Sequence, residues 1–253
     1  MRKMIFAVVL TALLLGGGSA QEKPWSDWTK AEAEKILNQS GWGQTQTETD
    51  TSEMMYSPTS QSGMGSSNRT GVSGTTTDRQ SVNSSRAAQG AKNQAISVNY
   101  HVRLLSAKPV RQAFMRVIEL AQKTPDKELI DGLQSFVQRD FSDFIVVAVA
   151  FDSTDGRFSG PALQAFASNT LGSLKTKTYL ERKDGKRVFL MQYHAPINDG
   201  LGAKFIFPRI VDEKKFITAD SGSFRFYSEV TTQLKLNVSF RISDLMYNGQ
   251  LEY

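Results

Sequence analysis

Apolar residues in the C-terminal half of the chain follow three different spacings, and each spacing predicts a different element. Over residues 96–104 every second residue is apolar, which is the period of a half-buried β-strand. Over 109–122 and 126–141 apolar residues recur three and four positions apart, so we expect two amphipathic helices, the first starting at Pro109. The run 144–151 is apolar throughout, which indicates a central strand covered on both faces.

The remainder of this half is rich in strand patterns. A third helix is expected over 160–171, and the Asp-Gly pair at 184–185 and the Asn-Gly pair at 248–249 favour tight hairpin turns. Further strands are expected at 202–210, 223–230 and 234–242. Because the helices come early and the strands late, without regular alternation, the sequence predicts an α+β fold with a largely antiparallel sheet and two or three helices.

A short amphipathic segment near the N-terminus contains all three tryptophans of the chain. Thr29 followed by Glu32 fits a capping box, which predicts a helix over 30–38 with Gly41 placed to end it. Each buried Trp or Leu stabilises by about 1.5–3 kcal/mol, so this apolar side needs a surface to rest on. We expect it to dock either on the chain's own C-terminal domain or on an envelope protein, as a helix in a groove. The candidate docking residues are Trp25, Trp28, Ile36, Leu37 and Trp42.

Two flanking segments have compositions that predict no packed core. The first twenty residues have two basic residues, an apolar run of eleven and small residues ending at Ala20, which is the layout of a secretory signal peptide. Residues 44–95 are mostly Ser, Thr, Gly, Gln and Asn and cannot bury enough apolar surface to fold, so we expect a disordered linker. The predicted organisation is a signal peptide at 1–20, a Trp-rich helical segment at 21–43, the linker at 44–95 and a globular domain at 96–253.

Composition and charge exclude several classes of protein. The chain has no cysteine, which excludes disulfides, a thiol nucleophile and a cysteine-linked lipid anchor. Without Arg2 and Lys3 of the signal, 28 basic residues face 25 acidic ones, a net charge of +3 that is too small to indicate nucleic-acid binding. We expect a protein that is exported to the periplasm or beyond, soluble after signal cleavage and not membrane-spanning.

Candidate chemistry is sparse. Asp152 and Asp155 end the apolar strand with hydroxyl residues between them, so they either hold a hard cation or form an ordinary Asp-Gly turn. The two histidines, His101 and His194, have no second ligand at metal-binding spacing, and no GxSxG motif occurs, so we assign neither a metal nor a cofactor. His194 and Asp199 lie near a glycine-rich turn that is either the rim of a pocket or a plain loop.

Basic residues at outward strand positions suggest one further partner. They either form a face for an acidic polysaccharide or keep sheets from stacking on one another. The residues are Arg103, Arg187, Lys204, Arg225, Lys235 and Arg241.

Three segments together resemble a group of exported bacterial proteins without assigned function. They are W-x-x-W-T-K-x-E-A-E-K-I-L-N-x-S-x-W (25–42), D-G-L-G-A-K-F-I-F-P-R (199–209) and the ending Y-N-G-Q-L-E-Y. The resemblance implies export and a shared architecture, but no activity and no catalytic residue.

The sequence therefore favours an exported, non-catalytic binding or assembly protein of the cell envelope that docks through its Trp-rich helix. The alternative is an extracytoplasmic hydrolase that uses carboxylates near Asp152 and Asp155 or the loop of His194. A deep pocket joining these residues would favour the enzyme.

Overall fold

The structure is a computed structural model of the 253-residue chain, and it describes residues 23–50, 96–122 and 126–253. The predicted signal peptide and residues 51–95 of the predicted linker lie outside this part of the chain. All bounds and contacts below refer to the described residues.

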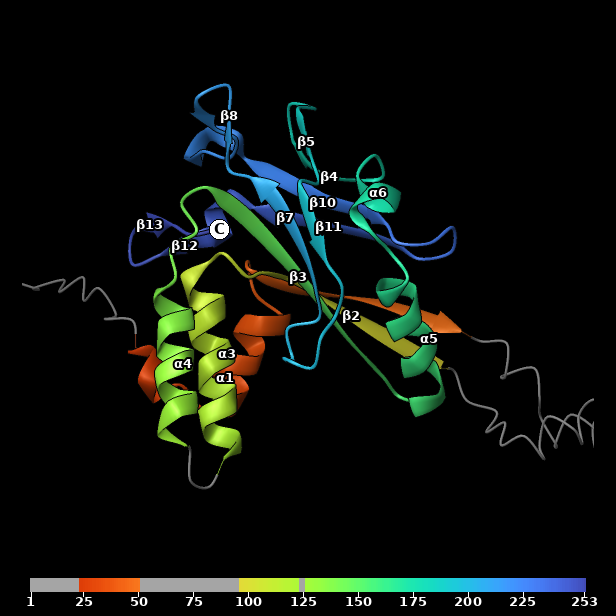
Figure 1. Cartoon of the computed structure of the whole chain (residues 1–253). Helices are drawn as coiled ribbons and strands as arrows, with labels where there is room; N and C mark the ends of the chain where they lie inside the picture. Colours follow the sequence, from red (N-terminus) through yellow and green to blue (C-terminus); the bar gives the residue numbers. More distant parts are fainter. Residues whose placement is uncertain (1–22, 51–95, 123–125) are drawn as a thin grey trace, which may run out of the picture.

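Two antiparallel sheets form the centre of the molecule (Figure 1). The larger has the order β1-β2-β3-β7-β6 and the smaller the order β11-β10-β4-β5. The strands of the larger sheet are β1 (Gly43–Asp50), β2 (Ile96–Leu104), β3 (Phe144–Ser153), β7 (Ala203–Pro208) and β6 (Gln192–His194). Those of the smaller are β11 (Lys235–Arg241), β10 (Ser223–Glu229), β4 (Thr178–Arg182) and β5 (Arg187–Phe189). Two short hairpins pair β8 (Ile210–Val211) with β9 (Lys214–Lys215) and β12 (Met246–Tyr247) with β13 (Gln250–Leu251).

The helices lie at two places around these sheets. In Figure 1 three of them stand side by side at the lower left, whereas α5 lies at the right beside β2 and β3. The three are α1 (Lys30–Asn38), α3 (Lys108–Ala121) and α4 (Lys127–Gln138), and the others are α5 (Gly156–Ala167) and α6 (Leu171–Leu174). Short 3-10 turns are η1 (Trp25–Asp27), η4 (Ala219–Ser221) and η5 (Ile242–Leu245). This arrangement confirms the predicted α+β class.

Aromatic side chains fill the core between the layers. Phe205 of β7 and Phe226 of β10 join the two sheets, with their ring centroids 5.3 Å apart. Phe166 of α5 stacks on Phe151 of β3 at 5.6 Å. The predicted central strand is confirmed, because β3 lies inside the larger sheet and is buried on both faces.

The predicted linker begins too early in the chain. Gly43–Asp50 form the edge strand β1, which pairs with β2 along its whole length, from Gly43 opposite Arg103 to Asp50 opposite Ile96. Its threonines have high β propensity, and β2 provides the hydrogen bonds that an isolated polar segment lacks. Its two glutamines, Gln44 and Gln46, also bind the backbone of β11, so this polar strand connects the two sheets.

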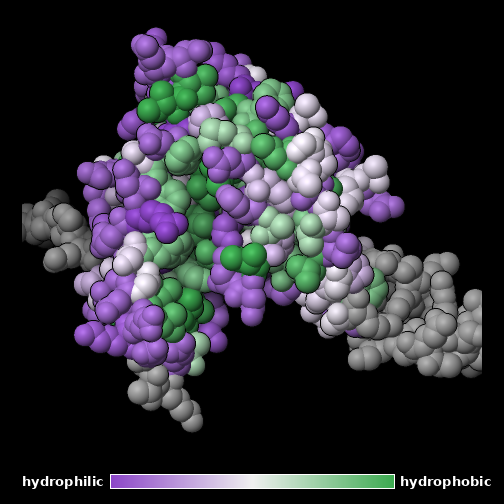
Figure 2. All heavy atoms as spheres, in the orientation of Figure 1, coloured by the Kyte–Doolittle hydropathy of each residue, from purple (hydrophilic) through white to green (hydrophobic). Residues whose placement is uncertain are grey.

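The outer surface is mixed. Figure 2 shows hydrophilic residues over much of the helical side, with apolar residues in the hollow between the helices and the strands. In the described part of the chain, no helix has the length and apolar character that crossing a bilayer requires.

Candidate functional site

The Trp-rich segment packs against its own chain. Trp28 and Leu37 keep only 8% and 4% of their surface exposed, and η1 and α1 lie on α3. Arg116 of α3 also donates from Nε to the backbone oxygen of Trp28 at 2.8 Å. Of the two predicted docking surfaces, the one that the segment covers in the structure is the chain's own domain. The buried Trp28 and Leu37 are therefore not open to a partner in this arrangement, because the apolar surface that would bind it is already covered.

The other residues of the predicted docking set are only partly buried. Ile36 packs at the edge of the same core. Trp42 donates from Nε1 to the backbone oxygen of Glu252 at 2.9 Å, and its ring meets the ring of Tyr247 edge-on at 6.1 Å. Trp42 thus packs the end of the segment against the C-terminal residues of the chain.

The predicted capping box is confirmed at the start of α1. Thr29 Oγ1 accepts from the backbone N–H of Glu32, and Glu32 Oε2 accepts from the backbone N–H of Thr29 at 2.6 Å. The hydrogen bond from Thr29, with a smaller contribution from Lys23, lowers the pKa of Glu32 to about 2. The ionised Glu32 and Thr29 therefore fix the first turn of α1, and with it the position of the preceding η1.

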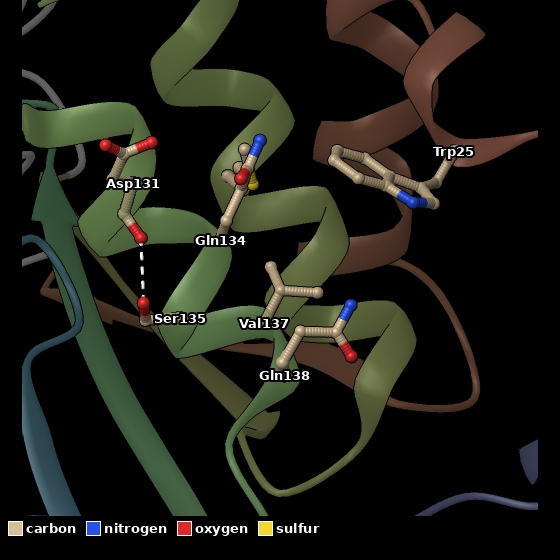
Figure 3. A pocket seen from close by; sticks show the side chains of 7 residues that line it. Trp25, Asp131, Gln134, Ser135, Val137 and Gln138 are labelled. Atoms are coloured by element: carbon tan, nitrogen blue, oxygen red, sulfur yellow. Dashed lines mark hydrogen bonds between the residues drawn. The ribbon is translucent and has the colours of Figure 1, made fainter. Parts of the chain in front are cut away.

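Trp25 forms one wall of a cavity of about 600 Å³ between η1, α3 and α4 (Figure 3). Met115 and Val137 provide an apolar floor, with 1% and 2% of their surfaces exposed. Four exposed polar residues of α4 complete the lining: Asp131, Gln134, Ser135 and Gln138. Figure 3 shows the indole of Trp25 on one side and the α4 side chains on the other.

The α4 residues reach the cavity together because of their helical spacing. Asp131, Gln134, Ser135 and Gln138 stand at intervals of three and four residues, so they lie on one stripe of the helix. Leu133 and Val137 anchor the helix in the core, and Asp126 caps its first turn. Ser135 Oγ donates to the backbone oxygen of Asp131 at 2.9 Å. Within the described chain, the amides of Gln134 and Gln138 and the carboxylate of Asp131 make no hydrogen bond or ion pair.

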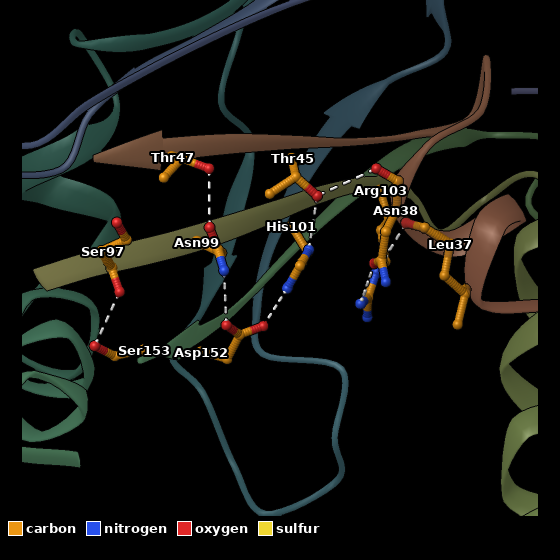
Figure 4. A network of polar contacts seen from close by, with 10 residues as sticks. All are labelled: Leu37, Asn38, Thr45, Thr47, Ser97, Asn99, His101, Arg103, Asp152 and Ser153. Atoms are coloured by element: carbon orange, nitrogen blue, oxygen red, sulfur yellow. Dashed lines mark hydrogen bonds and ion pairs between the residues drawn. The ribbon is translucent and has the colours of Figure 1, made fainter. Parts of the chain in front are cut away.

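A second polar cluster lies on one face of the larger sheet (Figure 4). His101 Nε2 and Asp152 Oδ2 are 2.5 Å apart, and Asn99 Nδ2 donates to Asp152 Oδ1 at 2.9 Å. On the other side, Thr45 Oγ1 lies 2.9 Å from His101 Nδ1. Sequence spacing does not reveal this contact, because strand pairing between β2 and β3 brings the histidine to the carboxylate across 51 residues.

Opposing effects act on the acid of this cluster. Burial raises the pKa of Asp152, but the hydrogen bonds from His101 and Asn99, together with the charges of His101 and Arg103, outweigh burial and hold the pKa below its usual value. Arg103 is itself buried, which lowers its pKa to about 10. Its guanidinium donates to the backbone oxygen of Leu37 and to Asn38 Oδ1, so it binds the end of α1.

The structure does not gather the remaining candidate residues into a site. Asp152 contacts His101 and Asn99, whereas the backbone N–H of Asp155 donates to Ser153 Oγ in the turn that follows β3. Within residues 23–50, 96–122 and 126–253, no three His, Asp or Glu side chains are placed to hold a metal ion.

In the described part of the chain, the structure does not bring the two residues of the predicted pocket rim, His194 and Asp199, together around a pocket. Asp199 pairs with Lys204 at 2.6 Å and accepts from the backbone N–H of Leu201, which orders its own loop. His194 is exposed at the end of the edge strand β6. Neither His194 nor Asp199 lines the Trp25 cavity.

The outward basic residues are matched by acids or by backbone oxygens. Glu181 pairs with both Arg187 and Arg225, and Arg187 also lies over the ring of Tyr179. Lys235 pairs with Glu229 at 3.8 Å and Arg241 with Asp244 at 2.9 Å. Arg103 is buried against α1, and Lys204 pairs with Asp199. These pairings weaken the positive field that an acidic polysaccharide would need.

Comparisons with protein-family models, with curated proteins and with solved structures give no match. The function proposed below therefore rests on the chemistry and geometry of the described residues.

Proposed function

We propose that this chain is an exported, non-catalytic binding protein of the cell envelope whose ligand site is the cavity between Trp25 and α4. One observation carries the proposal. The cavity combines an aromatic wall, an apolar floor and a row of four polar side chains. Three of these, Asp131, Gln134 and Gln138, have no side-chain partner among the described residues. Pockets for small molecules likewise combine aromatic and apolar surface with polar groups that orient the ligand, and a volume of about 600 Å³ lies within their usual range.

The proposal gives the Trp-rich segment two different roles. Trp28 and Trp42 hold the segment on the domain, one by burial and one by its hydrogen bond to Glu252. Trp25 is only half-buried and faces the cavity, so it is the tryptophan that a ligand can contact. Docking of the segment on its own domain thus builds the site instead of closing it.

Two energetic contributions would favour a bound molecule. Covering the exposed part of Trp25 gains about 25 cal/mol for each Å² of apolar surface removed from water. The amides of Gln134 and Gln138 are exposed, so they can exchange water for a ligand at little cost, provided that the ligand offers hydrogen bonds in return.

The binding function can be tested by ligand-observed NMR on the mature chain, residues 21–253. A chemically mixed set of small molecules is screened against the wild type, Trp25→Ala and Gln164→Ala, which makes a Gln→Ala change on the exposed face of α5. We expect compounds that bind the wild type and Gln164→Ala but lose binding in Trp25→Ala. If no compound shows binding that depends on Trp25, the cavity is not a ligand site.

The proposed export is tested separately from ligand binding. Expression of the full chain in a bacterium, followed by fractionation and mass determination, is expected to give a periplasmic or extracellular protein that begins at Gln21. Retention of residues 1–20 on a cytoplasmic protein would contradict the proposal.

A second candidate function, hydrolysis by an extracytoplasmic enzyme, is favoured by the cluster around His101. Thr45 Oγ1, the His101 ring and Asp152 form a hydroxyl–imidazole–carboxylate chain, with contacts of 2.9 and 2.5 Å. Such a chain is the arrangement that activates a hydroxyl nucleophile. However, Thr45 also lies 3.1 Å from the backbone oxygen of Asn38, which competes for its single proton. Hydrolysis of p-nitrophenyl acetate that is abolished by both Thr45→Val and Asp152→Asn would establish the enzyme, and equal rates in all three chains would exclude this catalytic chain.

A further inference from the structure

We propose that the Trp25 cavity binds an uncharged carbohydrate of about two sugar rings. This inference rests on the proposed function, because it assigns a ligand class to the same site. Three features of the lining carry it: its charge, the half-buried indole of Trp25, and the spacing of the planar polar groups.

The charge of the lining disfavours anions. Asp131 is the one ionisable residue among the seven that line the cavity. Arg116, the basic residue that fixes Trp28, binds Glu119 and the backbone oxygen of Trp28 and is not part of the lining. A phosphate or carboxylate ligand would therefore face a negative charge without a compensating cation.

The indole of Trp25 offers a surface of the right kind. In the described structure, no aromatic ring stacks on Trp25 and no guanidinium or ammonium lies over it, whereas Trp42 is engaged by Tyr247. The face of an indole carries partial negative charge, so it attracts weakly positive C–H groups as well as apolar surface. One side of a sugar ring presents such C–H groups in a flat patch.

The polar groups of α4 suit hydroxyl-rich ligands. Asp131 lies seven residues before Gln138, so the stripe extends over about 10 Å at 1.5 Å per residue. A carboxylate accepts two hydrogen bonds side by side, and each glutamine amide both donates and accepts. Neighbouring hydroxyl groups on a sugar can make these bonds in pairs. An apolar ligand would instead bury the same groups unpaired, at about 1–3 kcal/mol each.

The test is isothermal titration of the mature chain with three disaccharides: cellobiose, maltose and N,N′-diacetylchitobiose. We expect at least one to bind with one site per chain. Trp25→Ala should weaken that binding by about tenfold or more, since it removes the stacking surface. Trp25→Phe should weaken it less, and Gln134→Ala and Gln138→Ala should each weaken it severalfold. Gln164→Ala on α5 is the matched control and should bind as the wild type does.

The outcomes separate the ligand class from the binding function. Choline and cyclohexanol serve as the cationic and the apolar probe. Trp25-dependent binding of either one, with none of the three disaccharides bound, overturns the carbohydrate inference and leaves the cavity as a ligand site. Absence of Trp25-dependent binding in all five titrations, and in the NMR screen, overturns both. If Trp25→Ala fails to fold, which its thermal unfolding curve will show, the Trp25→Phe and glutamine variants decide the question.

Discussion

Gln46 and Asn237, 191 residues apart in the chain, meet through a hydrogen bond of 2.9 Å from the backbone N–H of Asn237 to the side-chain oxygen of Gln46. The same side chain donates from Nε2 to the backbone oxygen of Lys235 at 2.8 Å. The amide of Gln46 thus binds β11 as a peptide group of a neighbouring strand would. It covers an edge of the smaller sheet that would otherwise present unpaired backbone groups.

Replacing Gln46 with alanine removes both of these bonds at once. We expect Gln46→Ala to lower the free energy of unfolding by about 1–2 kcal/mol, because two backbone groups of β11 lose their partner but regain some water. The measurement is urea unfolding followed by circular dichroism. Gln233→Ala, at an exposed loop position, is the control and should change the free energy by less than about 0.5 kcal/mol. Equal effects of the two substitutions would show that the bridge contributes nothing.

Gly43 sits where the chain leaves α1 and enters β1. A Cβ at this position would lie 2.1 Å from the backbone oxygen of Leu37, a distance that requires the backbone to move. We expect Gly43→Ala to destabilise the fold by about 2 kcal/mol or more. The same change at Gly132 of α4 meets no atom within 4 Å, and it should stabilise by about 0.5–1 kcal/mol because alanine favours a helix. Thermal unfolding measures the change in stability that each of the two substitutions causes. Changes of the same sign would contradict the prediction.

Tyr253 ties the end of the chain to the core. Its hydroxyl donates to the backbone oxygen of Ile217 at 2.7 Å, the guanidinium of Arg209 lies 4.1 Å from its ring centre, and only 3% of its surface is exposed. We expect Tyr253→Phe to cost about 1 kcal/mol, since it leaves a buried carbonyl unpaired. Tyr227→Phe is the matched control, because the hydroxyl of Tyr227 makes no hydrogen bond to another described residue. A loss of the same size in both variants would argue against a specific role of the Tyr253 hydroxyl.

The contact between His101 and Asp152 should make the free energy of unfolding depend on pH in the acidic range. Because the pKa of Asp152 is held below its unfolded value of about 4, its ionised form stabilises the fold above that pH. This contribution is lost as the pH falls through the lower, folded value. We therefore expect Asp152→Asn to be less stable than the wild type at pH 5 and to approach it at pH 3, as measured by urea unfolding. Other acids with lowered pKa values, such as Glu181 and Glu229, are common to both chains and cancel in the difference. A gap that does not change between the two pH values would show that the acid is not stabilised by its partners.

Elements with a local signal could be predicted from the sequence. The alternation of Leu236, Val238 and Phe240 with polar neighbours gave β11 with the correct face inward, and Asp184-Gly185 gave the turn between β4 and β5. The helical spacing of apolar residues gave α3 and α4 to within a few residues. In each case one segment is enough for the prediction, because the spacing of its apolar residues matches the periodicity of a strand or a helix.

The missed features depend on segments far apart in the chain. β1 alternates threonine with glutamine and glutamate, so its period of two carries no hydrophobic signal, and its order comes from β2 and β11. The stripe of Gln134 and Gln138 has the composition of any solvated helix face. It lines a cavity because Trp25 is placed opposite by the docking of η1 on α3, which a sequence pattern does not report.

Asp50 and Ile96 are cross-strand partners, so the described segments on either side of residues 51–95 end at adjacent points. Exchanging that whole stretch for a short turn would preserve every contact described between residues 23–50 and the domain. For a chain severed there, we expect the smaller fragment, which carries Trp25, α1 and β1, to bind the larger one through the β1–β2 pairing and the contact of α1 with α3. We expect the two polypeptides, made separately and then mixed, to assemble the cavity between Trp25 and α4.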